Sequence, residues 1–138
     1  MTRLEITDYE SQTDAILAIR FEVFVNEQSV PPELEVDGRD STCTHAVAFD
    51  GDRAVGTGRL LPDGHIGRVA VLKSHRNRGI GEAIMKRLIE AAKAKGFEEV
   101  LLSSQTQATR FYERLGFASE GERYMEAGIE HIDMRLEL

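Results

Sequence analysis

The sequence predicts one α/β domain over residues 1–138, with a mixed sheet flanked by helices. A length of 138 residues with 41% apolar content suffices for one hydrophobic core but not for two. β-rich runs fill the middle of the chain, and helical spacing, a short apolar strand and helical spacing again follow them. That order predicts a sheet that is antiparallel first and that later contains a parallel pair with a right-handed crossover.

The first half reads as a strand, a helix and an antiparallel meander. Residues 4–6 alternate apolar and polar as a strand does, and residues 14–25 place their apolar side chains on one helical face. The prolines at 31 and 32 require a loop. Three β-rich runs follow, separated by glycine-containing turns: 45–50, 54–61 and 65–72.

The second half changes to helical spacing. A long helix is expected from the turn at 79–81 to a stop at Gly96, and a short apolar strand follows at 99–102. Apolar residues then recur at i, i+3, i+4 and i+7 over 108–115, which predicts a second helix ended by a glycine. Residues 131–138 alternate again and close the chain as a strand.

Composition narrows the function classes. Seventeen basic against twenty-four acidic residues give a net charge of -7, which argues against nucleic acid or an anionic membrane as the main partner. No secretory signal and no apolar stretch of membrane-spanning length are present, so a cytoplasmic protein is expected. The single Cys43 is interpreted as a buried strand residue, and the four histidines lack the spacing of metal ligands, so no metal is expected.

The segment Arg76-Asn77-Arg78-Gly79-Ile80-Gly81 follows a strand and opens a helix. Free backbone N–H groups and the helix dipole converge at such a point, and Gly79 and Gly81 let a pyrophosphate approach the main chain. Arg76 and Arg78 add positive potential. The alternative is a glycine turn with solvated basic residues. The Walker and Rossmann patterns are both excluded by sequence and position.

Two segments together resemble the GCN5-related N-acetyltransferases (GNAT). Residues 76–81 are similar to the Arg/Gln-x-x-Gly-x-Gly/Ala pyrophosphate loop of that family. Residues 105–117 are similar to its Asn-x-x-Ala-x-x-Phe-Tyr-x-x-x-Gly-Phe segment, with Gln105 in place of the asparagine. The element order matches over essentially the whole chain, and residues 23–28 resemble the small bacterial ElaA-like branch.

The resemblance implies a GNAT-type sheet with a splayed parallel pair and acetyl-CoA as the co-substrate. The pantetheine arm would lie beside residues 69–71 and 101–103, bonded to the main chain like an extra strand. A homodimer is common in the family and stays open here. The cofactor-binding residues implied are Val69, Val71, Arg76, Arg78, Gly79, Ile80, Gly81, Gln105, Phe111 and Tyr112.

Acetyl transfer to an amine needs an oxyanion donor, a proton donor and a base. The resemblance assigns the first role to the Val71 backbone N–H and the second to Tyr112, whose alternative is packing beside Phe111. His131 on the last strand is the preferred base, its alternative being a surface histidine. Glu27 or a water relay is the competing base.

Arginines on apolar faces suggest the acceptor. Arg20 on the first helix and Arg68 in an apolar strand each need an anion, and Arg59 is a third candidate. One interpretation is that the anion is a carboxylate or phosphate of the substrate, with Glu27 as a further substrate-binding residue. The other is that it is an internal carboxylate such as Glu22, Glu27, Glu35 or Asp37. The negative net charge instead favours a cationic acceptor such as a polyamine or a lysine side chain.

The preferred function is an N-acetyltransferase that moves an acetyl group from acetyl-CoA to a primary amine of a small molecule, by direct attack in a ternary complex. Two alternatives keep the same cofactor site: a catalytically weak CoA-binding sensor or interaction module, and an acetyltransferase of a protein amine. A nucleotide-binding protein that uses the same turn for ATP is disfavoured, because no arrangement of magnesium ligands is evident.

Overall fold

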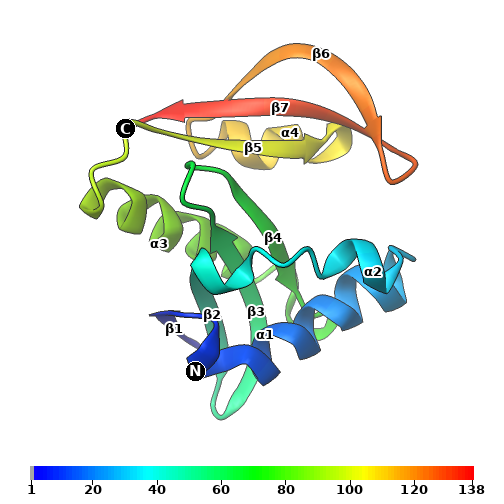
Figure 1. The fold of residues 1–138 in the computed structure, drawn as a ribbon, viewed down its shortest axis with the longest axis vertical. Coiled ribbons are helices and arrows are strands. Elements are labelled where there is room, and N and C mark those ends of the chain that lie inside the picture. Colours follow the sequence, from blue (N-terminus) through cyan, green and yellow to red (C-terminus); the bar gives the residue numbers. More distant parts are fainter. Residues whose placement is uncertain (1) are drawn as a thin grey trace.

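The computed structural model describes residues 2–138 and contains two antiparallel sheets (Figure 1). The first has the order β1-β2-β3-β4 and the second the order β5-β7-β6. The first sheet comprises β1 (Thr2–Thr7), β2 (Thr44–Asp50), β3 (Arg53–Leu60) and β4 (Ile66–Val71). The second comprises β5 (Glu99–Gln105), β6 (Ala118–Glu126) and β7 (Ile129–Glu137).

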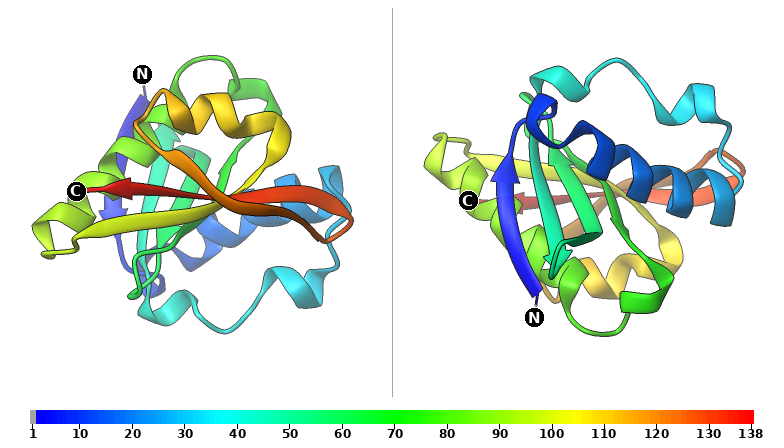
Figure 2. Two further views of the ribbon diagram at one scale, coloured as in Figure 1. Left: turned by 90° about the horizontal axis from the view of Figure 1, so that it is seen from above. Right: turned by 90° about the horizontal axis from the view of Figure 1, so that it is seen from below.

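Two helices cover opposite faces of the first sheet, α1 (Thr13–Arg20) and α3 (Ile80–Ala94) (Figure 2). The alternation of β2 shows this, because Val47 and Phe49 pack in one cluster with Ile16 of α1, whereas Ala46 and Ala48 pack in the cluster that contains α3. A π-helical segment, Phe21–Glu27, continues α1. The remaining short helices are α2 (Pro32–Glu35) and α4 (Thr109–Glu113).

Glycines on β3 let α3 lie close to the sheet. A Cβ on Gly56 would stand 2.9 Å from Ile84 Cδ1, and one on Gly58 would stand 2.9 Å from Ile84 Cγ2. Both distances are shorter than real Cβ contacts, so any side chain at these two positions would push α3 outward. The glycines therefore fix the height of α3, and with it the position of its N-terminus beside β4.

The two sheets meet at the parallel strands β4 and β5. One bridge, between His65 and Leu101, joins them, and the Leu101 N–H donates to Gly64 O at 3.0 Å. Beyond this bridge no further pairing between β4 and β5 occurs within residues 2–138. The expected splayed parallel pair is confirmed, with the sheet divided into two halves at the splay.

A β-bulge bends β4 just past the bridge, where the strands have begun to diverge. Thr57 pairs with Ala70 and Arg59 pairs with Gly67, so Gly58 alone stands opposite two residues, Arg68 and Val69. Arg68 takes φ 51°, a left-handed conformation that is uncommon for a residue with a side chain. The bulge turns the last residues of β4 toward the gap between the sheets.

The expected element order is confirmed, with three differences. The helix expected at 14–25 changes to π-helical hydrogen bonding at Phe21. The helix expected at 108–115 is shorter, with a 3-10 turn before α4. Strand β6 was not expected, because all nine of its residues are exposed and therefore carry no apolar alternation.

No helix within residues 2–138 is both long and apolar enough to cross a membrane. Cys43 is buried directly before β2, where its Sγ lies 3.2 Å from Arg39 O. Burial raises the pKa of this thiol, as expected for a buried cysteine beside a strand.

A buried ion-pair network ties α1 and β3 to the segment around α2. Arg20 donates from Nε to Glu35 and from Nη1 to Asp40, both at 2.6 Å, and its side chain is only 1% exposed. Arg59 donates to Asp37 at 2.6 Å and to Asp40 at 3.0 Å. Burial opposes ionisation of Asp40, but the two arginines outweigh it and lower its pKa.

We therefore expect Asp40→Asn to lower the free energy of unfolding by about 3 kcal/mol at pH 7, because it leaves two buried guanidinium groups short of a charge. A carboxyl whose pKa is lowered on folding stabilises the fold above its unfolded value near 4 and loses that contribution as pH falls. Urea titrations should show the gap between variant and wild type closing in acid. Glu90→Gln, on an exposed position of α3, is the control, and an equal effect of both substitutions would contradict the role of the network.

Candidate active site

The N-terminus of α3 presents free hydrogen-bond donors. Gly79, with φ 80°, caps the helix without a side-chain hydrogen bond, and the first backbone bond of the helix runs from Ala83 N–H to Gly79 O. The N–H groups of Ile80, Gly81 and Glu82 have no acceptor among residues 2–138. Three donors at the positive end of a 15-residue helix form an anion-binding site.

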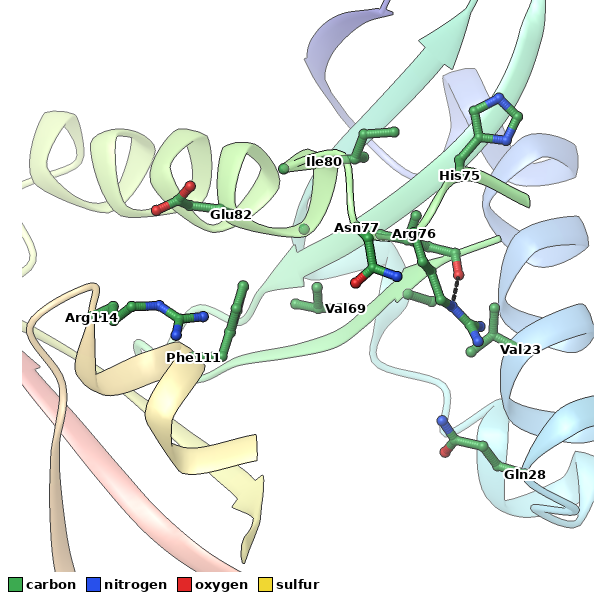
Figure 3. A pocket seen from close by; sticks show the side chains of 14 residues that line it. Val23, Gln28, Val69, His75, Arg76, Asn77, Ile80, Glu82, Phe111 and Arg114 are labelled. Carbon is green, nitrogen blue, oxygen red and sulfur yellow. Dashed lines mark hydrogen bonds between the residues drawn. The ribbon is translucent and has the colours of Figure 1, made fainter. Parts of the chain in front are cut away.

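A cavity of about 510 Å³ lies in front of these donors (Figure 3). Phe111 of α4 and Arg114, which directly follows that helix, stand on one side of it, and Arg76 and Val23 stand on the other. A Cβ on Gly81 would lie 3.7 Å from Phe111 Cζ, so the glycine keeps this floor of the cavity open. The predicted cofactor residues that line the cavity are Val69, Val71, Arg76, Gly79, Ile80, Gly81 and Phe111.

Arg76 and Glu27, predicted for different roles, bind each other. Arg76 donates from Nε to Val71 O and from Nη2 to Glu27 Oε1, both at 2.9 Å. The Glu27 carboxylate thus faces a cation on the cofactor side, and Glu27 does not line the cavity that holds His131. Arg78 is exposed just outside the first cavity.

The open edge of β4 carries main-chain groups that do not pair with another strand, although Val71 O accepts from Arg76. Leu72 N–H donates to Val55 O at 2.9 Å, and antiparallel pairs alternate, so Val71 opposite Gly56 turns its N–H and C=O away from β3. On β5, Leu101 N–H already points toward β4, and two residues later Ser103 points the same way. The gap is therefore lined by strand edges from both sides.

A second cavity, of about 810 Å³, continues from the first. Val69 and Gln28 line both, which makes the two cavities one groove through the splay. The second cavity brings Tyr112 and His131, the two predicted catalytic residues, into one space. Gln105 and Arg68 line it as well.

Tyr112 lies between two aromatic rings. Its centroid is 5.0 Å from that of Phe111 and 6.1 Å from that of Phe117, each in an edge arrangement. Burial raises the pKa of Tyr112 above its usual value near 10. The phenol therefore keeps its proton at neutral pH, and it forms no hydrogen bond with the described part of the chain.

His131 has a defined tautomer. Its Nδ1 lies 2.7 Å from Ile129 O, and since a carbonyl only accepts, Nδ1 carries the hydrogen. The neutral ring then has its lone pair on Nε2, which lies 3.8 Å from Glu126 Oε2. Tyr124 stacks on the imidazole, with ring centroids 6.0 Å apart.

The expectation that Arg20 binds the acceptor is corrected. Its guanidinium is buried in the ion pairs with Glu35 and Asp40 and does not line the second cavity. Arg59 is held by Asp37 and Asp40 in the same way. Both arginines therefore pair with internal carboxylates rather than with a substrate. Glu35, the partner of Arg20, is one of the internal carboxylates that the sequence suggested.

Arg68 differs from the other two arginines. Its side chain is 30% exposed and lines the second cavity. It donates from Nη2 to Leu34 O and to Glu35 O, both at 3.3 Å, and its distances to carboxylates are longer than those of the other two arginines, 3.4 Å to Glu35 and 3.6 Å to Asp37. Burial and the charge of Arg59 lower its pKa. Among these arginines, Arg68 is the one that a bound molecule can reach.

Sequence reasoning missed three residues at the groove: Arg114, Tyr124 and Glu126. Arg114 lies inside the family-like segment and could have been found there. The other two depend on the register of β6 and β7, for which the sequence gives no motif. No group of three His, Cys, Asp or Glu side chains within residues 2–138 is arranged to hold a metal ion.

Comparisons with known proteins identify the family. The family model of the acetyltransferase (GNAT) domain matches residues 6–138. The uncharacterized N-acetyltransferase YjcF of Bacillus subtilis is 41% identical over 133 residues, which cover 94% of this chain and 95% of YjcF. The chain therefore belongs to the GNAT family of acetyltransferases.

Solved structures agree with this assignment. The crystal structure of Escherichia coli ElaA superposes with a TM-score of 0.89 at 31% identity and covers 99% of this chain and 100% of that one. The ElaA-like branch is thereby confirmed. A Bacillus subtilis acetyltransferase in complex with CoA shares the fold at 20% identity, with a TM-score of 0.75 over 100% of this chain and 99% of that chain.

We expect Gly81→Val to weaken CoA binding by at least about tenfold, or 1.4 kcal/mol, because the branched side chain would fill the floor of the first cavity. Gly81→Ala, whose methyl meets Phe111 and Val71 at ordinary contact distance, is the matched control and should change binding much less. Isothermal titration calorimetry measures both. Equal affinity of Gly81→Val and wild type would show that CoA does not lie over this glycine.

Proposed function

We propose that the chain is an acetyl-CoA-dependent N-acetyltransferase that acts on a primary amine of a small molecule by direct attack in a ternary complex. The observation that carries the proposal is the continuous groove. It has free helix N–H groups at one end and Tyr112 with His131 at the other, and the open strand edges lie between them.

The first cavity suits the diphosphate of CoA. The N–H groups of Ile80, Gly81 and Glu82 would donate to it, and Arg76, Arg78 and Arg114 surround that end with positive charge. The CoA complex of the Bacillus subtilis acetyltransferase supports the same ligand class for this fold. Arg76 would exchange its contacts with Val71 and Glu27 for the ligand.

The pantetheine arm fits the splay. Its amides would bond to the free edge of β4 at Val69 and Val71, beside Ser103 and Gln105 of β5. Phe111 and Tyr112 would flank it from α4. This placement brings the thioester to the junction of the two cavities, next to the Val71 N–H.

The residues on the two sides of this junction supply what acetyl transfer requires. His131 Nε2 accepts a proton from the acceptor amine, whose lone pair then forms the C–N bond. Val71 N–H donates to the carbonyl oxygen as it becomes negative. When the C–S bond breaks, the electron pair leaves on sulfur and Tyr112 donates its phenolic proton to the thiolate. The new amide nitrogen then gives up its extra proton to the Tyr112 phenolate, which leaves a neutral amide and restores the phenol.

We expect amine-dependent release of CoA from acetyl-CoA, and Tyr112→Phe should lower kcat by roughly 10²-fold at saturating substrates because it removes the general acid. Tyr9→Phe, at a tyrosine beside His45 and away from the groove, is the control and should leave kcat unchanged. Because burial raises the Tyr112 pKa, loss of activity through its ionisation should appear only above pH 10. CoA binding without turnover of any amine would favour a binding module over an enzyme.

His131→Ala should abolish the acid limb of kcat/KM and lower the rate near neutral pH, because it removes the proton acceptor at the acceptor end of the groove. The measurement is a pH profile of CoA release for wild type and variant with one amine. Glu137→Gln, at an exposed position of the same strand and outside the cavity, is the control. An acid limb unchanged in His131→Ala would exclude His131 as the base.

A further inference from the structure

The charges around the second cavity differ in how far they are already neutralised. Glu35 and Asp37 line the cavity, yet Arg20 holds the first at 2.6 Å and Arg59 holds the second at 2.6 Å. Arg68 also lies within ion-pair distance of both carboxylates. These two carboxylates are therefore already compensated. A third carboxylate of the lining, Asp63, is held by its neighbour His65, whose backbone N–H donates to Asp63 Oδ1 at 3.0 Å.

Glu126, at the opposite side, is different. Its side chain is 61% exposed, lines the same cavity, and forms no ion pair with Lys or Arg within the described part of the chain. The neighbours of its Oε2 are His131 Nε2 at 3.8 Å and Ser103 Oγ at 3.4 Å. Glu126 therefore has an imidazole nitrogen and a hydroxyl beside it, with no lysine or arginine of the described chain on its carboxylate, so it can accept a cation.

One tight hairpin fixes both members of the pair. Ala127 and Gly128 have φ values of 52° and 76°, so they form the two-residue turn between Glu126 and Ile129. Ile129 O in turn holds His131 Nδ1. The turn that positions the Glu126 carboxylate thus also directs the lone pair of His131 toward it.

We propose that Glu126 and His131 form the binding site of the acceptor's ammonium group, which names the substrate class for the proposed function and rests on it. The ammonium donates to Glu126 Oε2 and transfers one proton to His131 Nε2, which leaves the neutral amine to attack the thioester. Glu126 faces the positive charge before and after the transfer, first on the ammonium and then on the imidazolium.

The same carboxylate excludes a class of acceptors. An α-amino acid bound through its amine would bring its own carboxylate close to Glu126, where like charges repel. An anion at the far end of the molecule would instead meet the exposed side chain of Arg68 across the cavity. The acceptor is therefore an alkyl ammonium with no carboxylate on the carbon that bears the amine, either a free small amine or a lysine side chain.

Three amines with the same five-carbon chain test this: pentylamine without a carboxylate, 6-aminohexanoate with a remote one and its isomer 2-aminohexanoate with one beside the amine, with CoA release as the readout. We expect kcat/KM for 2-aminohexanoate to be at least tenfold below the other two. Glu126→Gln should raise KM for pentylamine by tenfold or more and narrow the difference between the isomers. Glu122→Gln, an exposed glutamate on the same strand, should change neither. A lysine amide blocked at its α-amine stands for a lysine side chain of a protein, and comparing it with pentylamine distinguishes a protein acceptor from a free small amine. Acetylation of either one supports the proposed ammonium site.

Equal use of the two isomers by wild type, or an unchanged KM in Glu126→Gln, would overturn the proposal. If wild type acetylates none of these amines, the proposed function fails. Binding of pentylamine, measured by NMR, then still tests whether Glu126 and His131 bind an ammonium group. Tighter binding to wild type than to Glu126→Gln would preserve an ammonium site, and equal or absent binding would overturn it.

Discussion

The divergence of β4 from β5 is the constraint on which the rest of the site depends. Within residues 2–138 a single bridge at His65 and Leu101 joins the strands, and past it the facing edges of β4 and β5 do not pair with each other. The Val71 N–H is left free in the described part of the chain, and the Val71 carbonyl accepts from the side chain of Arg76. Unpaired N–H and C=O groups inside a fold are costly unless water or a ligand satisfies them. The gap therefore joins the two cavities. It also offers strand-edge N–H and C=O groups to which an extended ligand containing amides can hydrogen-bond.

Several features keep the gap open at the right place. Gly56 and Gly58 let α3 approach the sheet, so the free donors at Ile80–Glu82 stand beside the end of β4. The bulge at Arg68 turns the strand edge outward. The ion pairs from Arg20 and Arg59 to Asp40 anchor the segment before β2 that walls the second cavity.

The cofactor end could be predicted from the sequence because its chemistry lies in a contiguous run. Gly79 and Gly81 stand at a helix start, and main-chain donors there follow from local geometry alone. The acceptor end could not be predicted in the same way. The partners of Arg20 are 15 and 20 residues away in segments without periodicity, and the approach of Glu126 to His131 depends on the register of a hairpin whose first strand is wholly exposed.

The most direct test of the account is a titration of the ¹⁵N-labelled protein with CoA, followed through its backbone amide resonances. We expect the largest shifts at Ile80, Gly81 and Glu82, with further shifts at Val71 and Ser103 along the strand edges. Unmoved helix-start amides at saturating CoA, with the shifts confined to another surface, would contradict the account.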